Sequence, residues 1–358
     1  AKRPVDTLLP AVPPSRYPES SADNFTVDYR RVLSASQDKK TVIIDVRPAE
    51  TPFPVTRLST LKSEEQSFRD AGDLIRTVPN INGIRKGGVA LDPVVRGFKF
   101  SQLNIQANNG QKIEGGCPNR MDNPMSHFEI DDMRELEIYK GPYALRYGQV
   151  FGGVINLKTF KPKPAKKLQR NAGANKGYEY NWNGMKQQLY VKGGNDKFYF
   201  YASGNHKAYQ DYSDGNGNVV PSHFTRYNYS LQAGTTLIKS QQFLLSFEES
   251  YGRNIAFPSL PMDEREDDTR LMSADYQGKF TSGRPSQLKI KVYSSDVHHE
   301  MDNKNRPYSD TVVAISTIHA QNYGGRAEFN LKLGQDQMIV GGEIEEIRKD
   351  GERNKNMI

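Results

Sequence analysis

The chain has 358 residues, a net charge of +7 and a hydrophobic fraction of 36%, with 19 tyrosines and 16 phenylalanines against a single tryptophan. Its basic residues are scattered rather than gathered on a face with stacking aromatics, which argues against a nucleic-acid-binding protein. No run of about 18 apolar residues is present, which excludes a transmembrane helix. A polar average with many Tyr and Phe residues fits both a transmembrane β-barrel and a soluble β-rich protein, so composition leaves both classes open.

The first 160 residues divide into two parts. Residues 1–40 contain several prolines and little apolar periodicity, and we predict a flexible segment there. Residues 41–160 contain four short motifs, which in chain order are DLIRTVPNI (73–81), VRGF (95–98), LEIYKGPYALRYG (136–148) and GGVINLKT (152–159). Gly148, Gly152 and Gly153 in the last two motifs predict tight turns where backbones approach closely.

In this order, and followed by the alternating strands described below, the four motifs resemble the plug domain of TonB-dependent outer-membrane receptors. The resemblance implies that residues 41–160 form an α+β plug domain in the lumen of a β-barrel. Paired charges would then hold the plug to the barrel wall, and the charged residues of the plug that we consider for this role are Arg96, Glu137, Lys140 and Arg146.

The same resemblance implies a partner in the periplasm. In such receptors a short extended box near the N-terminus pairs by strand addition with TonB, a protein anchored in the inner membrane. The β-prone segment 41–46 is our first choice for this TonB box, and segment 5–9 is the second. The residues of the first choice are Thr41, Val42, Ile43, Ile44, Asp45 and Val46.

The second half of the chain, 161–358, is predicted to be the N-terminal part of a membrane barrel. From about residue 184, apolar and polar residues alternate with a period of two, as in 225–237 and 326–333, which predicts strands with one apolar and one wet face. Short connections are predicted near 194–196, 239–240, 282–286 and 334–336, and long polar ones near 209–222, 253–267 and 302–314. Short and long connections alternate strictly, as the periplasmic turns and extracellular loops of an outer-membrane barrel do.

The barrel strands are predicted to number about nine, each longer than a typical globular strand. An open sheet edge has no hydrogen-bond partners in lipid, and bacterial single-chain barrels have even strand numbers. We therefore expect the barrel to be incomplete in these 358 residues.

The only cysteine lies in the plug, four residues before a methionine, so that Cys117 and Met121 form a C-x-x-x-M pair. A locally helical segment would place both on one face, and Pro118 would be tolerated at its first position. Thiolate and thioether are soft ligands, which select Cu(I) rather than the Fe(III) of a siderophore. Met125 and His127 follow closely, either as auxiliary ligands or as loop residues packed against the wall.

A second cluster, DVHHEM, spans residues 296–301 of a barrel strand. Because the apolar residues of 288–292 are predicted to face lipid, the alternation places His299 and Met301 in the lumen and His298 and Glu300 outside. The strand leaves a short periplasmic connection, so His299 and Met301 are expected at its extracellular end, where a substrate would first meet the plug.

C-x-x-x-M in a plug with H-x-M in a barrel strand resembles the copper-specific outer-membrane receptors of the OprC/NosA type. The residues that match are Cys117, Met121, His299 and Met301. The resemblance implies one copper ion, with Cu(I) favoured, held by sulfur and imidazole ligands at the plug–barrel interface.

The sequence thus predicts a TonB-dependent copper importer of the bacterial outer membrane, with TonB and outer-membrane lipid as partners. No substrate bond need be made or broken, so we do not expect an enzyme. Three alternatives stay open: a receptor for a siderophore or cobalamin, a non-transporting copper-binding surface barrel, and a soluble metal-binding β-protein.

Overall fold

The computed structural model describes residues 55–59, 68–140, 144–148, 150–238, 240–281, 283, 285–334 and 336–357. The predicted flexible segment 1–40 and both TonB-box segments, 41–46 and 5–9, lie outside the described residues. In the described ranges, no helix has the length and apolar character that a membrane span would need.

The plug consists of two small sheets with short helices between the strands. Its elements are β1 (Val55–Ser59), α2 (Ala71–Ile75), β2 (Ile81–Ile84), β3 (Asp92–Val95), β4 (Phe98–Lys99), η2 (Phe100–Gln102), β5 (Leu103–Ala107), η3 (Ile130–Asp132), β6 (Met133–Lys140), η4 (Leu145–Tyr147) and β7 (Gly153–Thr159). One sheet has the order β1-β6-β7-β5, with β5 parallel to β7, and the other has the order β2-β3-β4. Leu136, Ile138 and Ile155, which are fully buried, form the core of the first sheet.

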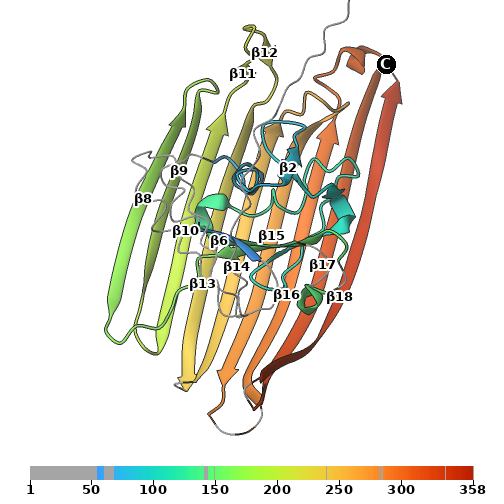
Figure 1. The fold of residues 1–358 in the computed structure, drawn as a ribbon. Coiled ribbons are helices and arrows are strands. Elements are labelled where there is room, and N and C mark those ends of the chain that lie inside the picture. The colour runs from blue at the N-terminus through green and yellow to red at the C-terminus, as the bar shows by residue number, and fades with distance from the viewer. Residues whose placement is uncertain are drawn as a thin grey trace, which may run out of the picture. The chain divides into compact units, whose positions relative to one another are not determined.

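A nine-stranded antiparallel sheet follows the plug in the chain and lies beside it in space (Figure 1). Its strands are β8 (Gln169–Glu179), β9 (Gly184–Gly194), β10 (Phe198–Tyr209), β13 (Phe224–Ile238), β14 (Gln241–Ile255), β15 (Asp263–Lys279), β16 (Pro285–Asp302), β17 (Val312–Leu333) and β18 (Asp336–Met357). Strands that follow one another along the chain are neighbours, from β8 at one edge to β18 at the other. The prediction of about nine long strands is confirmed.

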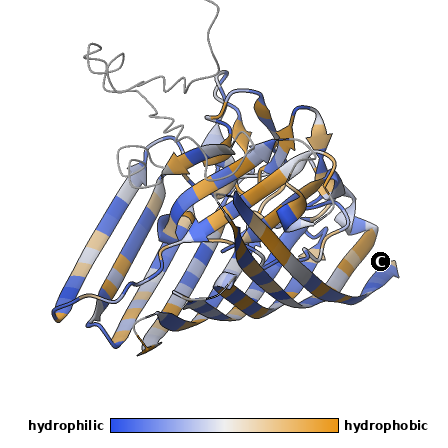
Figure 2. Ribbon diagram, turned by 60° about the horizontal axis from the view of Figure 1, so that its bottom comes forward, coloured by the Kyte–Doolittle hydropathy of each residue, from blue (hydrophilic) through white to orange (hydrophobic). Residues whose placement is uncertain are grey.

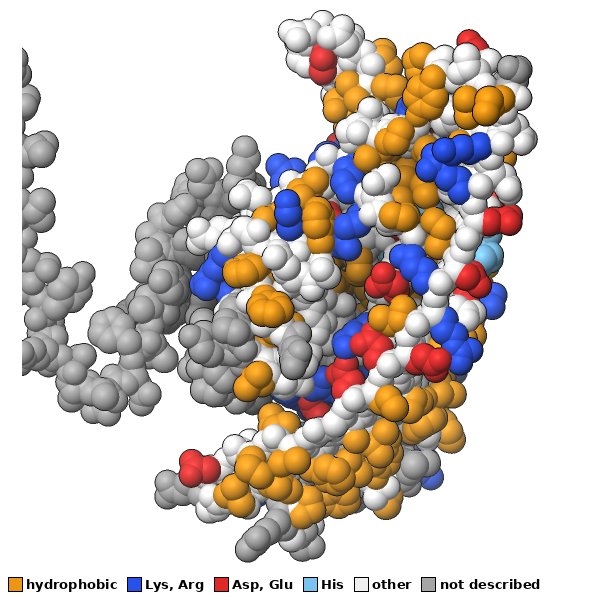
Figure 3. Space-filling view, turned by 90° about the vertical axis from the view of Figure 1, so that its right-hand side faces the viewer, with side chains coloured by type: hydrophobic (Ala, Val, Ile, Leu, Met, Phe, Trp, Pro, Cys, Tyr) orange, Lys and Arg blue, Asp and Glu red, His pale blue; other side chains and the backbone are white. Residues whose placement is uncertain are grey.

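The burial of the two faces of this sheet is inverted relative to a soluble protein. In β13 the apolar residues Tyr227, Tyr229 and Leu231 are exposed, whereas the polar Arg226 and Asn228 between them are buried against the plug. Figure 2 shows the resulting hydrophilic and hydrophobic bands along the strands, and Figure 3 shows hydrophobic side chains gathered over the lower part of one side. A wet inner face and an apolar outer face are the pattern of a barrel wall in a membrane.

The connections alternate in length as predicted, with one correction. The predicted long connection 253–267 is only 256–262, because the charged run 263–268 continues β15. These carboxylates have cationic partners on other strands: Asp267 accepts from Arg226 at 2.7 Å, and Asp268 pairs with Arg253. Paired charges are compatible with a strand, so the polar composition of this run wrongly indicated a loop.

Only one of the four charged plug residues considered above is seen to bind the wall directly. Arg146 makes a two-pronged contact with Glu328 of β17, with N···O distances of 2.9 and 2.7 Å. Glu137 instead pairs within the plug, with Arg57 at 3.1 Å and Lys158 at 2.5 Å. Lys140 donates to the Pro79 carbonyl at 3.3 Å, and Arg96 is exposed.

Asp132, at the end of η3, ties the plug to the start of the wall. It accepts hydrogen bonds from Tyr201 at 2.7 Å, from Asn205 at 3.0 Å and from Gln188 at 3.1 Å, all on strands β9 and β10. Complete burial raises the pKa of Asp132 to about 6, and the nearby carboxylates Glu129 and Asp131 contribute in the same direction. The folded protein therefore holds a proton here at pH values where the unfolded chain has lost it.

This raised pKa predicts a stability that falls as the pH rises. Between about pH 4 and about pH 6 the native state binds more protons than the unfolded state, and the loss across this window is about 3 kcal/mol. Denaturant unfolding of the plug at pH 4.5 and pH 7 measures it, and the Asp132→Asn variant should show a smaller difference than the wild type. An equal difference in both proteins would contradict the assignment.

Candidate metal centre

The segment 115–122 is a series of turns that presents Cys117 and Met121 to the wall. The Arg120 amide donates to the Cys117 carbonyl at 2.9 Å, and Arg120 has a φ of 56°, which is incompatible with a regular helix. The local helix considered from the sequence is therefore wrong. The Asp122 carboxylate fixes the turns instead, because it accepts the amide of Cys117 at 2.8 Å and also that of Gly116.

This segment is anchored to the plug and pressed against the wall. The Arg120 guanidinium binds the buried carboxylate of Asp92 in β3 through two N···O contacts of 2.5 and 2.9 Å. The side chain of Asn123 donates to the Ala90 carbonyl at 2.7 Å. A Cβ atom on Gly116 would lie 2.7 Å from the Cβ of His299, so only glycine permits this approach of the plug backbone to β16.

The wall contributes His299 and Met301, which lie near the C-terminal end of β16, beside the connection 303–311. Their neighbours across the sheet on β15 are Asp267, which pairs with His299, and Glu264, which pairs with Met301. His299 is 0% exposed and Met301 is 6% exposed, whereas His298 and Glu300 are only partly buried. The side chains of β16 thus alternate in the phase that the sequence predicts.

The two sulfur-bearing segments meet. The Sγ of Cys117 lies 3.8 Å from the Sδ of Met301, and Met121 belongs to the same buried cluster. Two sulfur ligands at about 2.3 Å from one tetrahedral ion would be separated by about 3.8 Å. The observed separation equals this value and is therefore compatible with both sulfur atoms binding one ion.

His299 has no hydrogen bond that would explain its burial. Both ring nitrogens lack a partner among the described residues, although the side chain is completely buried. Its Nδ1 lies 3.8 Å from Asp122 and 3.9 Å from both Glu264 and Asp267, which is beyond hydrogen-bond distance. One ligand atom each of Cys117, Asp122 and His299 lies within 4.8 Å of the other two. A buried imidazole that makes no hydrogen bond to the described residues and lies close to a thiol is suited to binding a metal ion.

Met125 and His127, the two residues left open as auxiliary ligands, have other partners. Met125 belongs to the apolar core cluster of the plug rather than to the cluster of Cys117 and Met301. The His127 ring contacts the Thr269 hydroxyl at 2.8 Å and the Asp122 carbonyl at 3.1 Å. Both are accounted for as residues that pack the loop against its surroundings.

Sequence reasoning missed Asp122, Glu264 and Asp267. The first directly follows the C-x-x-x-M motif, but its role depends on the turn that it caps. The other two lie in the charged run that was predicted to be a loop. The sequence feature that could have indicated them is the density of carboxylates in 263–268, at the start of a strand whose lumen face is polar.

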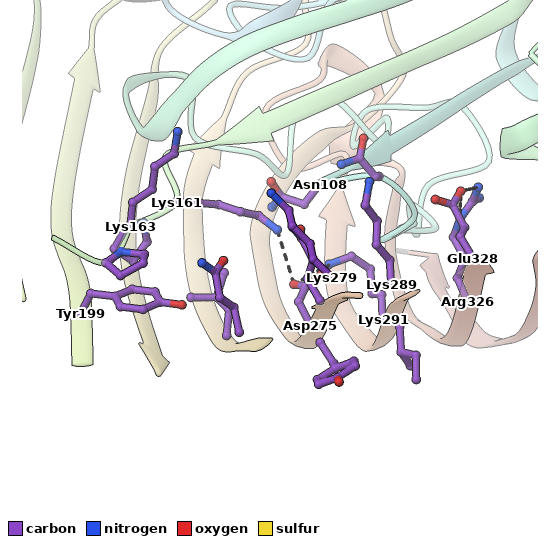
Figure 4. A pocket seen from close by; sticks show the side chains of 18 residues that line it. Asn108, Lys161, Lys163, Tyr199, Asp275, Lys279, Lys289, Lys291, Arg326 and Glu328 are labelled. Carbon is purple, nitrogen blue, oxygen red and sulfur yellow. Dashed lines mark hydrogen bonds and ion pairs between the residues drawn. The ribbon is translucent and has the colours of Figure 1, made fainter. Parts of the chain in front are cut away.

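A separate cavity of about 530 Å³ lies between the plug and the half of the wall that carries the short connections. Figure 4 shows it with lysines from several segments, among them Lys161, which forms an ion pair of 3.5 Å with Asp275. Ammonium groups repel a metal cation, and none of the described residues that line this cavity carries a sulfur atom. It is therefore not a rival site for a copper ion.

Comparison with known proteins agrees with the fold. The family model described as TonB-dependent Receptor Plug Domain matches residues 47–154. With the inverted burial of the wall strands, this match shows an outer-membrane protein of the TonB-dependent receptor class, with its plug domain and part of its barrel wall.

Among solved structures, the copper transporter OprC is similar, with a TM-score of 0.76 and 25% identity over 84% of this chain and 47% of that chain. The hemophore receptor HasR of Serratia marcescens, solved as a double mutant with HasA and heme, has a TM-score of 0.71 and 16% identity, over 85% of this chain and 46% of that one. The FrpB iron transporter of Neisseria meningitidis has a TM-score of 0.69 and 18% identity, over 82% and 49%. The chain spans about half the length of these structures.

Proposed function

We propose that this protein is a TonB-dependent outer-membrane copper receptor that imports copper, binding Cu(I) through Cys117, Met121, His299 and Met301. The observation that carries the proposal is the 3.8 Å separation of Cys117 Sγ and Met301 Sδ beside an imidazole without hydrogen bonds. Soft sulfur ligands select Cu(I) over the hard Fe(III) of siderophores. The similarity to the copper transporter OprC supports the same cargo.

The division of the ligands between two parts of the chain suits import. Cys117 and Met121 belong to the plug, whereas His299 and Met301 belong to the wall. A displacement of the plug by TonB removes half of the ligands from the ion, so binding and release need no separate device. The site lies near the long connection 303–311. Long connections of outer-membrane barrels are extracellular, so the site would face the outside of the cell.

The first test measures the cargo. The purified full-length protein, incubated anaerobically with Cu(I) and passed through a desalting column, should retain about one copper per chain by elemental analysis, as one mixed sulfur and imidazole site requires. Heme, a ferric siderophore and cobalamin, offered in parallel, should not be retained. Retention of one of these, with no copper, would overturn the proposal in favour of the corresponding receptor.

The second test separates import from surface binding. Deletion of residues 41–46, the proposed TonB box, should abolish copper accumulation in cells and leave copper binding by the purified protein unchanged. Accumulation that survives this deletion, and also survives loss of TonB, would identify a copper-binding surface barrel instead of an importer.

A further inference from the structure

A cluster of buried carboxylates lies on the other side of His299 from the sulfur atoms. Glu264 and Asp267 of β15 are 1% and 0% exposed, and Asp122 of the plug is 1% exposed. One ligand atom each of Glu264, Asp267 and His299 lies within 4.8 Å of the other two. Of the four residues matched to the C-x-x-x-M and H-x-M motifs, only His299 belongs to this set.

The hydrogen bonds that reach the cluster come from few groups. Arg226 binds Asp267 at 2.7 Å and lies 3.9 Å from Glu264, but its other amino group is directed to the Ser126 carbonyl at 2.7 Å. His127 is engaged by Thr269 and by a backbone carbonyl. Arg226 is thus the one guanidinium that the described residues bring to Asp267 and Glu264, and the imidazoles of His127 and His299 lie 3.8–3.9 Å from the carboxylates. Burying several ionisable groups together is costly unless they are well paired.

Several buried polar atoms of the cluster have no hydrogen-bond partner among the described residues. Glu264 Oε1, Asp267 Oδ1 and both nitrogens of His299 accept and donate no hydrogen bond among the described residues. Glu264 Oε2 and Asp267 Oδ1 each lie 3.9 Å from His299 Nδ1. Oxygen and nitrogen ligands of one tetrahedral ion, at about 2.1 Å from it, would be about 3.4 Å apart. A small movement of the Glu264 and Asp267 side chains toward His299 Nδ1 would bring Glu264 Oε2 and Asp267 Oδ1 to this distance from it.

We propose that Glu264, Asp267 and His299 form a binding site for a divalent transition-metal ion, distinct from the sulfur site and sharing its imidazole. Nδ1 faces the carboxylates, which leaves Nε2 for the sulfur side. Two carboxylates and an imidazole prefer a borderline divalent ion such as Zn(II) or Cu(II), whereas Cys117 and the methionines prefer Cu(I). The two sites therefore sort ions by softness, and this one does not depend on the copper import proposed above.

The experiment first removes two of the three sulfur ligands proposed above, Cys117 and Met301. The full-length Cys117→Ala/Met301→Leu protein, dialysed against Zn(II), should retain about one zinc ion per chain, by the three-ligand site with an open position described above. Adding Glu264→Gln and Asp267→Asn should weaken zinc binding by more than about tenfold. Glu266→Gln on the same strand, outside the cluster, is the matched control and should leave zinc binding unchanged.

A second readout guards against misfolding. Because Glu264→Gln replaces a buried carboxyl group by a neutral amide of the same size, the metal-free variant should unfold at a temperature equal to or above that of its parent, while the rise in unfolding temperature caused by zinc should disappear. A Cys117→Ala/Met301→Leu protein that takes up no zinc would show that protons neutralise the cluster, and would overturn the proposal. Equal zinc affinity with and without Glu264 and Asp267 would overturn it too. Neither result bears on Cu(I) binding by the wild type.

Discussion

Replacing Cys117 by alanine is expected to weaken Cu(I) binding at least about 100-fold, which corresponds to about 2.8 kcal/mol of binding free energy. The substitution removes the one thiolate of the proposed site and leaves Met301 without the sulfur atom that lies 3.8 Å from it. A competition titration against a Cu(I) chelator of known affinity, performed anaerobically on the detergent-solubilised protein, measures the change.

The methionines of this chain provide the control. Met301→Leu should also weaken Cu(I) binding, because it removes a thioether from the sulfur pair. Met125→Leu is the same substitution at a residue that is equally buried, at 1% exposed, but lies in the core of the plug. Its Cu(I) affinity should equal that of the wild type. Undiminished copper in the Cys117→Ala protein, or an equal loss in Met125→Leu, would refute the site assignment.

Replacing Lys207 by alanine is expected to destabilise the seating of the plug by about 3–5 kcal/mol, the usual cost of breaking a buried ion pair by removing one partner. Lys207 projects from β10 into the lumen, where it pairs with Glu129 and lies 3.6 Å from Asp131. It also donates to the Arg69 carbonyl at 3.0 Å. The substitution leaves Glu129, which is 6% exposed, without its cation.

Hydrogen exchange of the plug amides in the full-length protein should reveal this loss as faster exchange in η3 and β6, with the wall strands unchanged. Lys176→Ala on β8 is a matched control, because this lysine is exposed, and it should have no effect on plug exchange. Slow exchange in the Lys207→Ala plug would mean that the remaining contacts, such as those of Asp132 and Arg146, are sufficient to hold it.

The sequence by itself determined the barrel wall and its phase. Alternation with a period of two requires no knowledge of the neighbours, because a strand places successive side chains on opposite faces. The same rule placed His299 and Met301 inside and His298 outside. Val297, which fits a wet inner face poorly, is 0% exposed because the apolar core of the plug reaches β16 at that point.

The local conformation around Cys117 could be predicted only in part. The C-x-x-x-M spacing indicated that both sulfur atoms face one way, and both are buried in one cluster. A helix was the wrong reason: the turn depends on Asp122 accepting two backbone amides, and on the contact of Arg120 with Asp92, which is 28 residues away. Such long-range contacts leave no periodic trace in the sequence.

Only the tertiary structure decided which polar residues surround the sulfur atoms. Glu264 and Asp267 lie more than 140 residues after Cys117 in the chain, and their polarity alone is equally typical of a loop. The register of β15 against β16 sets Asp267 opposite His299 and Glu264 opposite Met301. Strand pairing and the approach of the plug at Gly116 together bring these residues to the sulfur atoms. Local residue patterns do not encode either of them, because both depend on the packing of segments that are distant in the chain.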